Sequence, residues 1–380
     1  MNAPVDDRLT ALRGSAQRRA YNARSLAALE NNPRCTLRAL LDASGSDKAA
    51  IAEHAGYPSA FGQSTFALAR GNAFEALVKA NGYAELLRVL RETLGLTVPE
   101  VGNRDLNDVG GDSRQEIRHT HTTRLLVKAA QGSGDSTLYD HPMLRLTVGG
   151  YAVFLEPDLV AFRADDRFYI VEIKSFPIID GQADPVQVKS ATTQACAYVI
   201  ALRDMLRQAG IDPEAAVSDQ IVLVAPKDFT NRPTAAFVDA RKQVAALTRQ
   251  LARLERIKDL VELLPEGLTF DLAPDGGQAQ RPVEELTDAL DQVDATYRPD
   301  CLNHCEMAFY CRARAREDAS LDILGPEARE QFGGVDTATM VMGLARGELT
   351  PTADQSEMAI ALRHAARLRA ELDQAYRGAA

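Results

Sequence analysis

Three charged residues near the middle of the chain are spaced so that two consecutive strands would bring them together. Asp158 follows Pro157, while Glu172 and Lys174 alternate with apolar residues in Phe168-Tyr-Ile-Val-Glu-Ile-Lys. This alternation places Glu172 and Lys174 on one face of a strand. If the strands 151–162 and 168–175 are joined by a three-residue loop at 164–166, antiparallel pairing sets Asp158 opposite Glu172.

Two carboxylates and one amine at the same place suit the hydrolysis of phosphodiesters. Hard oxygen ligands on neighbouring strands, completed by water and a substrate phosphate, make a site for Mg²⁺ or Mn²⁺. A lysine beside such a site can orient or help to deprotonate the attacking water, and can neutralise charge on the phosphate. The alternative is an ordinary hairpin in which Glu172 and Lys174 form a solvated ion pair.

With Pro157-Asp158 and Glu172-Ile173-Lys174 as its two signature pieces, this stretch resembles the PD-(D/E)XK nuclease superfamily. The resemblance implies that Asp158, Glu172 and the Ile173 carbonyl hold the divalent metal, and that Lys174 serves the attacking water. We therefore expect an α/β fold with the PD-(D/E)XK restriction-endonuclease-like core, a helix, three strands, a helix and a strand.

Two further motifs resemble the RecB-like branch of this superfamily. Gly71 and Glu75 have the spacing of a G-x-x-x-H motif on the helix before the catalytic sheet, with Glu in place of His. The resemblance makes Glu75 an additional metal ligand, and the alternative is an acidic residue favoured in the first turn of a helix by its dipole.

Gln194 and Tyr198 match the Q-x-x-x-Y motif of the same branch, which includes the exonucleases associated with CRISPR adaptation and the AddB subunits. By resemblance, they orient the catalytic lysine or contact nucleic acid. Being four residues apart, they share one helix face. The alternative is a polar helix face around Cys196, a core cysteine.

The expected elements follow from periodicity and turn signals. They are a helix over 71–94, a loop over 102–114, strands over 143–148, 151–162 and 168–175, a loop over 176–186, a helix over 188–208, a strand over 221–226, and amphipathic helices over 247–264 and 355–376. His119 and His121 alternate in a Thr-rich stretch, and on a strand they would face the same way. Two histidines without a third ligand favour a solvated strand face or a phosphate-contacting loop over a metal site.

Three of the five cysteines fall within eleven residues, in Cys301-x3-Cys305-x5-Cys311. A four-coordinate site needs one more ligand, and Cys35 is the natural candidate. The iron-sulfur subset of RecB-like nucleases has one cysteine before the core and three after it, usually spaced C-x2-C-x5-C, and the resemblance implies a [4Fe-4S] cluster on these four. Here the first gap is three residues, and His304 stands at the two-residue spacing, so a zinc site and unliganded core cysteines remain alternatives.

Arginines are concentrated in two segments of an otherwise acidic chain, whose formal net charge is −10. Between residues 8 and 38, the N-terminal arm has arginines at 8, 13, 18, 19, 24, 34 and 38 against the single acid Glu30. Arg312, Arg314 and Arg316 follow Cys311 and would add a basic strip that guides a strand toward the metal, unless both segments are solvated faces.

These features divide the 380 residues into five parts. They are a basic helical N-terminal region with Cys35 (1–70), the nuclease core (71–230), a helical insertion and connector (231–295), the cysteine cluster (296–317) and a helical tail (318–380). No apolar run reaches the ~20 residues of a membrane span, and the N-terminus lacks a signal-peptide core, so the expected compartment is the cytoplasm.

The function expected from the sequence is a metal-dependent DNA nuclease acting on single-stranded ends or overhangs, in DNA repair, recombination or anti-phage defence, with a helicase or other subunit as a possible partner. One rival is a catalytically silent DNA-binding or assembly subunit. The complete set of two acids and a lysine argues against it, because a retired site has no physical reason to keep a buried charged trio. A zinc-bearing scaffold would explain the cysteines but leave residues 156–198 unexplained.

Overall fold

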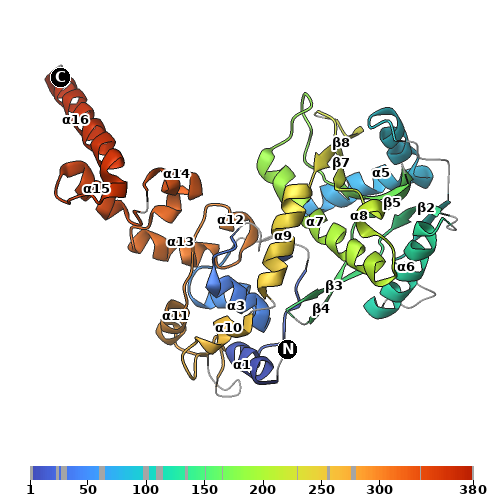
Figure 1. Cartoon of the computed structure of the whole chain (residues 1–380), viewed down its shortest axis with the longest axis horizontal. Coiled ribbons are helices and arrows are strands. Elements are labelled where there is room, and N and C mark those ends of the chain that lie inside the picture. The colour runs from blue at the N-terminus through green and yellow to red at the C-terminus, as the bar shows by residue number, and fades with distance from the viewer. Residues whose placement is uncertain are drawn as a thin grey trace.

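The computed structural model has a mixed α/β architecture, with a sheet flanked by helices, a second module made of helices, and a group of C-terminal helices (Figure 1). It describes residues 3–22, 25–26, 32–59, 65–96, 102–107, 114–132, 136–149, 151–164, 166–228, 230–254, 257–274, 280–333 and 335–378. The N-terminal Arg24 and Glu30 lie outside the described residues.

A six-stranded sheet of order β1-β2-β5-β6-β7-β8 forms the centre of the first part. Its strands are β1 (Gly102–Asp105), β2 (Ser136–Asp140), β5 (Leu159–Ala164), β6 (Arg167–Ile173), β7 (Gln220–Pro226) and β8 (Pro233–Asp239). The β2–β5, β5–β6 and β7–β8 pairs are antiparallel, and the β1–β2 and β6–β7 pairs are parallel. The parallel β6–β7 pair requires a crossover, which α7 (Pro185–Gln208) and the short α8 (Pro213–Ala216) provide.

Strand β6 is buried on both faces, which is typical of a nearly continuous run of apolar residues. Phe168 and Ile170 pack in one hydrophobic cluster with residues of α7, including Tyr198. Tyr169, Val171 and Ile173 pack in another cluster with residues of α5 (Thr65–Glu92) on the opposite face. Because side chains alternate along a strand, Glu172 belongs to the α7 face.

The expected single strand over 151–162 is wrong, since the structure has β4 (Tyr151–Leu155) and β5 on either side of Pro157. A proline donates no ladder hydrogen bond and is disfavoured inside a strand. Strand β4 pairs only with β3 (Leu144–Val148), in a separate two-stranded hairpin. The neighbour of β5 in the main sheet is instead β2, which the sequence analysis did not predict.

Two further expectations between β1 and β2 are corrected. Residues 102–105 of the expected loop form β1, and the stretch with His119 and His121 is helix α6 (Gln115–Ala130) rather than a strand. Positions two apart on a helix point in different directions, so the two histidines do not form a pair. The His119 ring nitrogen Nδ1 lies 3.0 Å from the Met143 carbonyl oxygen, and burial lowers the pKa of His119.

Helix α5 starts earlier than expected and is interrupted. Its backbone is non-helical from Ala80 to Tyr83, with positive φ at Asn81, Gly82 and Tyr83. Asn and Gly tolerate this left-handed conformation, and Gly also weakens a continuous helix. The interruption changes the direction of the chain directly after the turn that carries Glu75.

The helical module joins the two ends of the chain. One hydrophobic cluster contains residues from α1 (Ala3–Arg13), α3 (Thr36–Ser44), α4 (Lys48–His54), α10 (Ile257–Glu262), α11 (Val283–Asp291), α12 (Cys301–His304) and α13 (Ala308–Glu317). Hydrogen bonds join the N-terminal and the C-terminal segments of this module. The Leu37 backbone amide donates to the Asp294 carbonyl, and the Asn32 side-chain amide donates to the Thr296 carbonyl. The helix expected over 247–264 corresponds to α9 (Arg241–Leu254) and α10, and residues 255 and 256 between them lie outside the described residues.

The C-terminal part consists of η1 (Leu321–Leu324), α14 (Pro326–Gln331), α15 (Ala338–Arg346), η2 (Ala353–Gln355) and α16 (Ser356–Gly378). Helix α16 matches the expected helix over 355–376 and extends away from the body at the upper left of Figure 1. Met358 and Leu362 pack in the small core, whereas Leu368 and Leu372 are exposed. No helix among the described ranges is long and apolar enough to cross a membrane.

Candidate functional site

Asp158, Glu172 and Lys174 meet on strands β5 and β6. Leu159 pairs with Val171, so continuing this register by one residue sets Asp158 opposite Glu172, as expected. The Ile173 amide donates a hydrogen bond of 3.0 Å to Asp158 Oδ2. The turn differs from the expected three-residue loop, because Ala164 is paired within the ladder and the register shifts between Ala161 and Ala164.

The Glu172 carboxylate is fully buried, and its Oε2 oxygen has no hydrogen-bond partner among the described residues. Lys174 Nζ lies 2.5 Å from Glu172 Oε1 and forms a close ion pair with it. Burial, with the nearby Asp158 carboxylate, raises the pKa of Glu172 to about 7 in spite of Lys174. A buried acceptor without a donor is costly, so Oε2 is suited to a cation.

Burial also affects the pKa values of Asp158 and Lys174. Burial raises the pKa of Asp158, although Lys174 and the Ile173 amide oppose the shift. Burial disfavours the charged form of Lys174, but the Glu172 and Asp158 carboxylates outweigh it and raise the pKa of Lys174. The lysine is therefore protonated at neutral pH beside two carboxylates.

Helix α7 places Gln194 and Tyr198 against this trio. Gln194 Nε2 donates to the Tyr198 hydroxyl at 2.9 Å, as expected for positions four apart. Tyr198 is buried, and its pKa is raised well above the usual value by burial and by the Glu172 and Asp158 carboxylates. These two side chains therefore line the α7 side of the candidate site.

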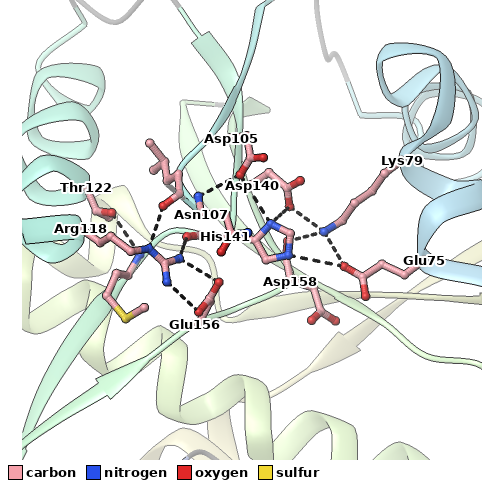
Figure 2. Close-up of polar contacts among 12 residues, drawn as sticks. Glu75, Lys79, Asp105, Asn107, Arg118, Thr122, Asp140, His141, Glu156 and Asp158 are labelled. Carbon is pink, nitrogen blue, oxygen red and sulfur yellow. Dashed lines mark hydrogen bonds and ion pairs between the residues drawn. The ribbon is translucent and has the colours of Figure 1, made fainter. Parts of the chain in front are cut away.

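On the other side, α5 delivers Glu75 together with Lys79, which the sequence analysis missed. Lys79 Nζ lies 2.5 Å from Glu75 Oε1, 2.6 Å from Asp140 Oδ1 and 3.3 Å from the Asp158 carbonyl oxygen. Figure 2 shows Glu75, Lys79 and Asp140 pointing toward one another above Asp158. The available signal was the i, i+4 spacing of Glu75 and Lys79, which brings the two onto one helix face.

The end of β2 adds Asp140 and His141, which the sequence analysis also missed. Asp105, Asp140 and His141 each offer one donor atom, and these atoms all lie within 4.8 Å of one another. His141 Nδ1 is 3.2 Å from Asp140 Oδ1, and His141 Nε2 is 3.8 Å from Glu75 Oε1. The Asp140 carboxylate raises the pKa of His141, whose backbone has a φ of 48°.

Arg118 on α6 holds together the three segments that end at this site. It donates to the Leu106 carbonyl after β1, to the His141 carbonyl after β2 and to Glu156 before β5 (Figure 2). Arg118 is buried, so its charge is compensated mainly by these acceptors. Its contacts fix the spacing of the chain around Asp158.

Cys35, Cys301, Cys305 and Cys311 gather in the helical module and are all buried. Burial raises the pKa of the Cys311 thiol well above its usual value, and proximity to the other three cysteines raises it further. Burial also raises the pKa of the Cys305 thiol to about 12. The folding of the two chain ends thus brings together the four residues that the resemblance assigns to one cluster.

Cationic side chains surround this cysteine group. Arg38 and Lys48 lower the pKa of Cys305 against the effect of burial, and Arg314 does the same for Cys311. Arg38 is buried and pairs with Asp42 at 3.1 Å. Asn32 Nδ2 donates to the Cys301 sulfur at 3.3 Å. These groups oppose the effect of burial, although the pKa values of Cys305 and Cys311 remain raised.

The three arginines of α13 do not form the single basic strip that the sequence predicts. Arg314 pairs with Asp291 at 3.0 Å, whereas Arg316 is exposed. Positions 312 and 316 share one helix face, and position 314 lies on the other side of the helix. In the N-terminal arm, Arg18 stacks 3.5 Å from the Tyr151 ring and Arg19 pairs with Asp47, so these arginines make contacts within the chain.

A cavity of about 510 Å³ lies between the N-terminal arm and the cysteine segment, away from Asp158 and Glu172. Its lining includes Arg19, Asp47 and His304. The charges along it pair with one another, since Lys48 contacts Asp42 and also lies 3.7 Å from Glu306. Volume alone does not make this cavity the reactive site, and the buried Glu172 does not line it.

Comparison with known proteins leaves the family open. No family model matches the chain, and no curated protein matches it. Three chains among the solved structures match. One, titled "Crystal structure of SSO0001", is 12% identical, covers 44% of this chain and 84% of its own, and has a TM-score of 0.19. A likeness at this level carries no argument about fold or function.

Proposed function

We propose that the chain is a metal-dependent DNA nuclease with a PD-(D/E)XK core. The observation that carries the proposal is the buried carboxylate of Glu172, whose Oε2 has no hydrogen-bond partner among the described residues, while Lys174 pairs with Oε1 and Asp158 lies beside it. An ordinary surface hairpin would leave this pair solvated, and Glu172 is instead excluded from water.

The residues around Glu172 fit a divalent cation of the Mg²⁺ or Mn²⁺ type. Asp158, Glu172, the Ile173 carbonyl and Glu75 would hold it, all through the hard oxygen ligands that such ions prefer. When bound, the ion supplies Lewis-acid activation of the phosphate and of water. The Ile173 amide orients Asp158, so its carboxylate is fixed before substrate arrives.

Lys174 would act on the attacking water. Its ammonium group is held at the Glu172 carboxylate and stays charged, so it can donate a hydrogen bond to the water and counter the charge that grows on the phosphate. Gln194 and Tyr198 would position this end of the site from α7. Each of these roles belongs to a side chain that is already in place.

The order of elements supports the same core. Helix α5, strands β2, β5 and β6, helix α7 and strand β7 follow one another, and β2, β5, β6 and β7 are neighbours in the sheet. These elements stand in the order helix, three strands, helix and strand, although the first of the three strands is β2 and not the expected strand over 143–148, which is β3 in the separate hairpin. The hairpin β3–β4 and the unit of β1 and α6 are insertions in it.

We further propose that Cys35, Cys301, Cys305 and Cys311 hold a [4Fe-4S] cluster. A tetrahedral zinc site with Zn–S bonds of ~2.3 Å brings its sulfurs within about 3.8 Å of one another. Among the described residues, no three of these sulfurs lie within 4.8 Å of one another. A [4Fe-4S] cluster bonds each thiolate to a different iron, and the four buried cysteines are the set that the resemblance assigns to it, with zinc as the alternative that metal analysis separates.

DNA with single-stranded ends or overhangs is the proposed substrate. A cleavage assay with strands labelled at the 5′ and the 3′ end, in Mg²⁺ and in Mn²⁺, tests the activity and reports its polarity. Metal-dependent cleavage that is lost in Glu172→Gln is the expected result. Binding of DNA without any cleavage would replace the nuclease with a silent DNA-binding or assembly subunit.

A further inference from the structure

We propose that helix α16 pairs in antiparallel fashion with α16 of a second copy of this chain, so that the protein is a dimer. The inference goes beyond the proposed function and uses no residue of the candidate site. It rests on the exposed half of α16, on the order of large and small side chains along one of its faces, and on the charged groups beside that face.

The C-terminal half of α16 projects from the molecule. Its first turns are held by the small C-terminal core, in which Ala359 is buried and against which Leu362 packs. Beyond them, every residue from 363 to 374 is exposed, and Figure 1 shows the helix extending away from the body to the C-terminus. Helices in proteins gain most of their stability from packing an apolar face. The projecting half of α16 therefore needs a partner if it has such a face.

One face of this half has an apolar stripe with the spacing of paired helices. Ala361, Ala365, Leu368 and Leu372 recur at intervals of four, three and four residues, which are the a and d positions of a heptad. Leu368 is 44% exposed and Leu372 is 60% exposed. Single apolar residues are normal on a protein surface, but these four form one continuous seam. The seam suits the matching stripe of another helix.

The order of side-chain sizes along the seam selects a second α16 in antiparallel orientation. If Leu368 of one copy lies opposite Ala365 of the other, Leu372 lies opposite Ala361, and two-fold symmetry repeats both contacts. Each layer then contains one leucine and one alanine, and such layers interdigitate. A parallel pair would set leucine against leucine and alanine against alanine, so the alanine layers would leave gaps.

The groups beside the seam favour the same arrangement. In the antiparallel pair, His364 lies beside Glu371 of the second copy, because both occupy g positions. Arg367 lies 2.8 Å from His364 Nδ1 and can only donate to it, so Nε2 of the neutral ring carries a proton for the Glu371 carboxylate. A parallel pair would instead set His364 beside Arg369, which offers no acceptor.

Sedimentation equilibrium of the full-length protein, at concentrations up to about 100 μM, tests the dimer. Three proteins are compared: wild type, Leu368→Glu with Leu372→Glu, and Ile360→Glu. Ile360 is a matched control, since it is 67% exposed on the same helix but lies outside the seam. We expect a dimer, a monomer and a dimer. If the double glutamate variant does not fold, Leu368→Ala with Leu372→Ala, which keeps the helix propensity, is measured with the same expectation.

A charge exchange tests the antiparallel register. Glu371→Lys should raise the dissociation constant of the dimer on the order of tenfold, because the two symmetric contacts with His364 are lost. Adding His364→Glu to Glu371→Lys should restore the wild-type constant, since each lysine then lies beside a glutamate of the other copy. A double variant that associates as weakly as Glu371→Lys would overturn the register.

Wild-type protein that stays monomeric at about 100 μM would overturn the inference, as would a dimer that survives the changes at Leu368 and Leu372 or one that Ile360→Glu dissociates equally. A monomeric wild type whose affinity for DNA falls in the Leu368 and Leu372 variant would assign the helix to nucleic acid instead. None of these results bears on cleavage, so the proposed function stands or fails separately.

Discussion

Lys174 Nζ lies 2.5 Å from the Oε1 atom of Glu172, and this carboxylate has no exposure to solvent. The pair lies at the end of β6 on the face that α7 covers, where burial penalises both charges. A buried ion pair seldom improves stability over apolar residues of the same size. The arrangement therefore points to chemistry, and the predictions below follow from it.

The first prediction concerns Glu172 and pH. The pKa of Glu172 is raised from 4.5 to about 7 in the folded chain, so its contribution to stability is greatest below pH 4.5 and is lost as the pH rises to about 7. In the presence of a chelator, Glu172→Gln should therefore gain on the order of 3 kcal/mol of unfolding free energy over wild type between pH 4.5 and pH 8. Denaturant unfolding at several pH values measures this difference. A pH-independent difference would contradict the raised pKa.

The same pair predicts how metal affects stability. Mn²⁺ at 100 times its dissociation constant should stabilise wild type by about 2.7 kcal/mol at pH 8 and leave Glu172→Gln nearly unchanged. Proton and metal compete for Glu172, so the stabilisation by metal should shrink as the pH falls below 7. Equal stabilisation of both proteins would place the ion away from Glu172.

Much of this site could be predicted from the sequence because it depends on local patterns. Alternation in β6 fixed the shared face of Glu172 and Lys174, and short-range antiparallel pairing brought Asp158 opposite Glu172. The spacing of Gln194 and Tyr198 likewise needs only one helix. Each of these relationships involves residues that are close in the chain or lie on one element.

The missed residues depend on contacts between distant segments. Asp140 meets Lys79 across 61 residues, and β2, which ends at Asp140, carries no strong strand signal of its own. The Thr-rich stretch around His119 forms a helix, because packing of Leu126 and Ala129 against the core overrides the weak helix propensity of threonine. The apolar pattern predicts one strand over 151–162, but Pro157 separates it into β4 and β5.

The cysteine group gives a prediction with an internal control. Protein purified without oxygen should be brown, absorb near ~400 nm and carry about four irons per chain. Cys35→Ser should lose the colour as fully as Cys305→Ser, because both belong to the same group. Cys196→Ser should keep it, since Cys196 lies on α7 and is buried in a separate hydrophobic cluster. Stoichiometric zinc without iron would remove the cluster from this account.

The arginines of α13 predict different effects for its two faces. Charge reversal of Arg312 and Arg316 should weaken DNA binding and flatten its dependence on salt, because each lost phosphate contact reduces counterion release. Arg314→Glu should change the slope less and should lower thermal stability, since it breaks the pair with Asp291. Binding isotherms at several salt concentrations measure the slopes. An unchanged slope for Arg312 and Arg316 would make them a solvated face.

The central claim is that Asp158, Glu172 and Lys174 cleave DNA with a divalent metal. Asp158→Ala removes an expected ligand, so activity should collapse and excess Mn²⁺ should restore part of it. Lys174→Ala leaves both carboxylates in place, so metal should still bind while turnover falls by about 100-fold or more. DNA binding should survive both changes, because contacts to phosphates elsewhere supply most of it.

The most direct measurement is cleavage of end-labelled single-stranded, double-stranded and overhang DNA in Mn²⁺ by wild type and by Lys174→Ala, both with their iron content verified. We expect wild type to cut at least one substrate about 100-fold faster than the variant at equal metal occupancy. Wild-type protein that binds metal and DNA yet cuts none of the three substrates faster than Lys174→Ala would contradict the account.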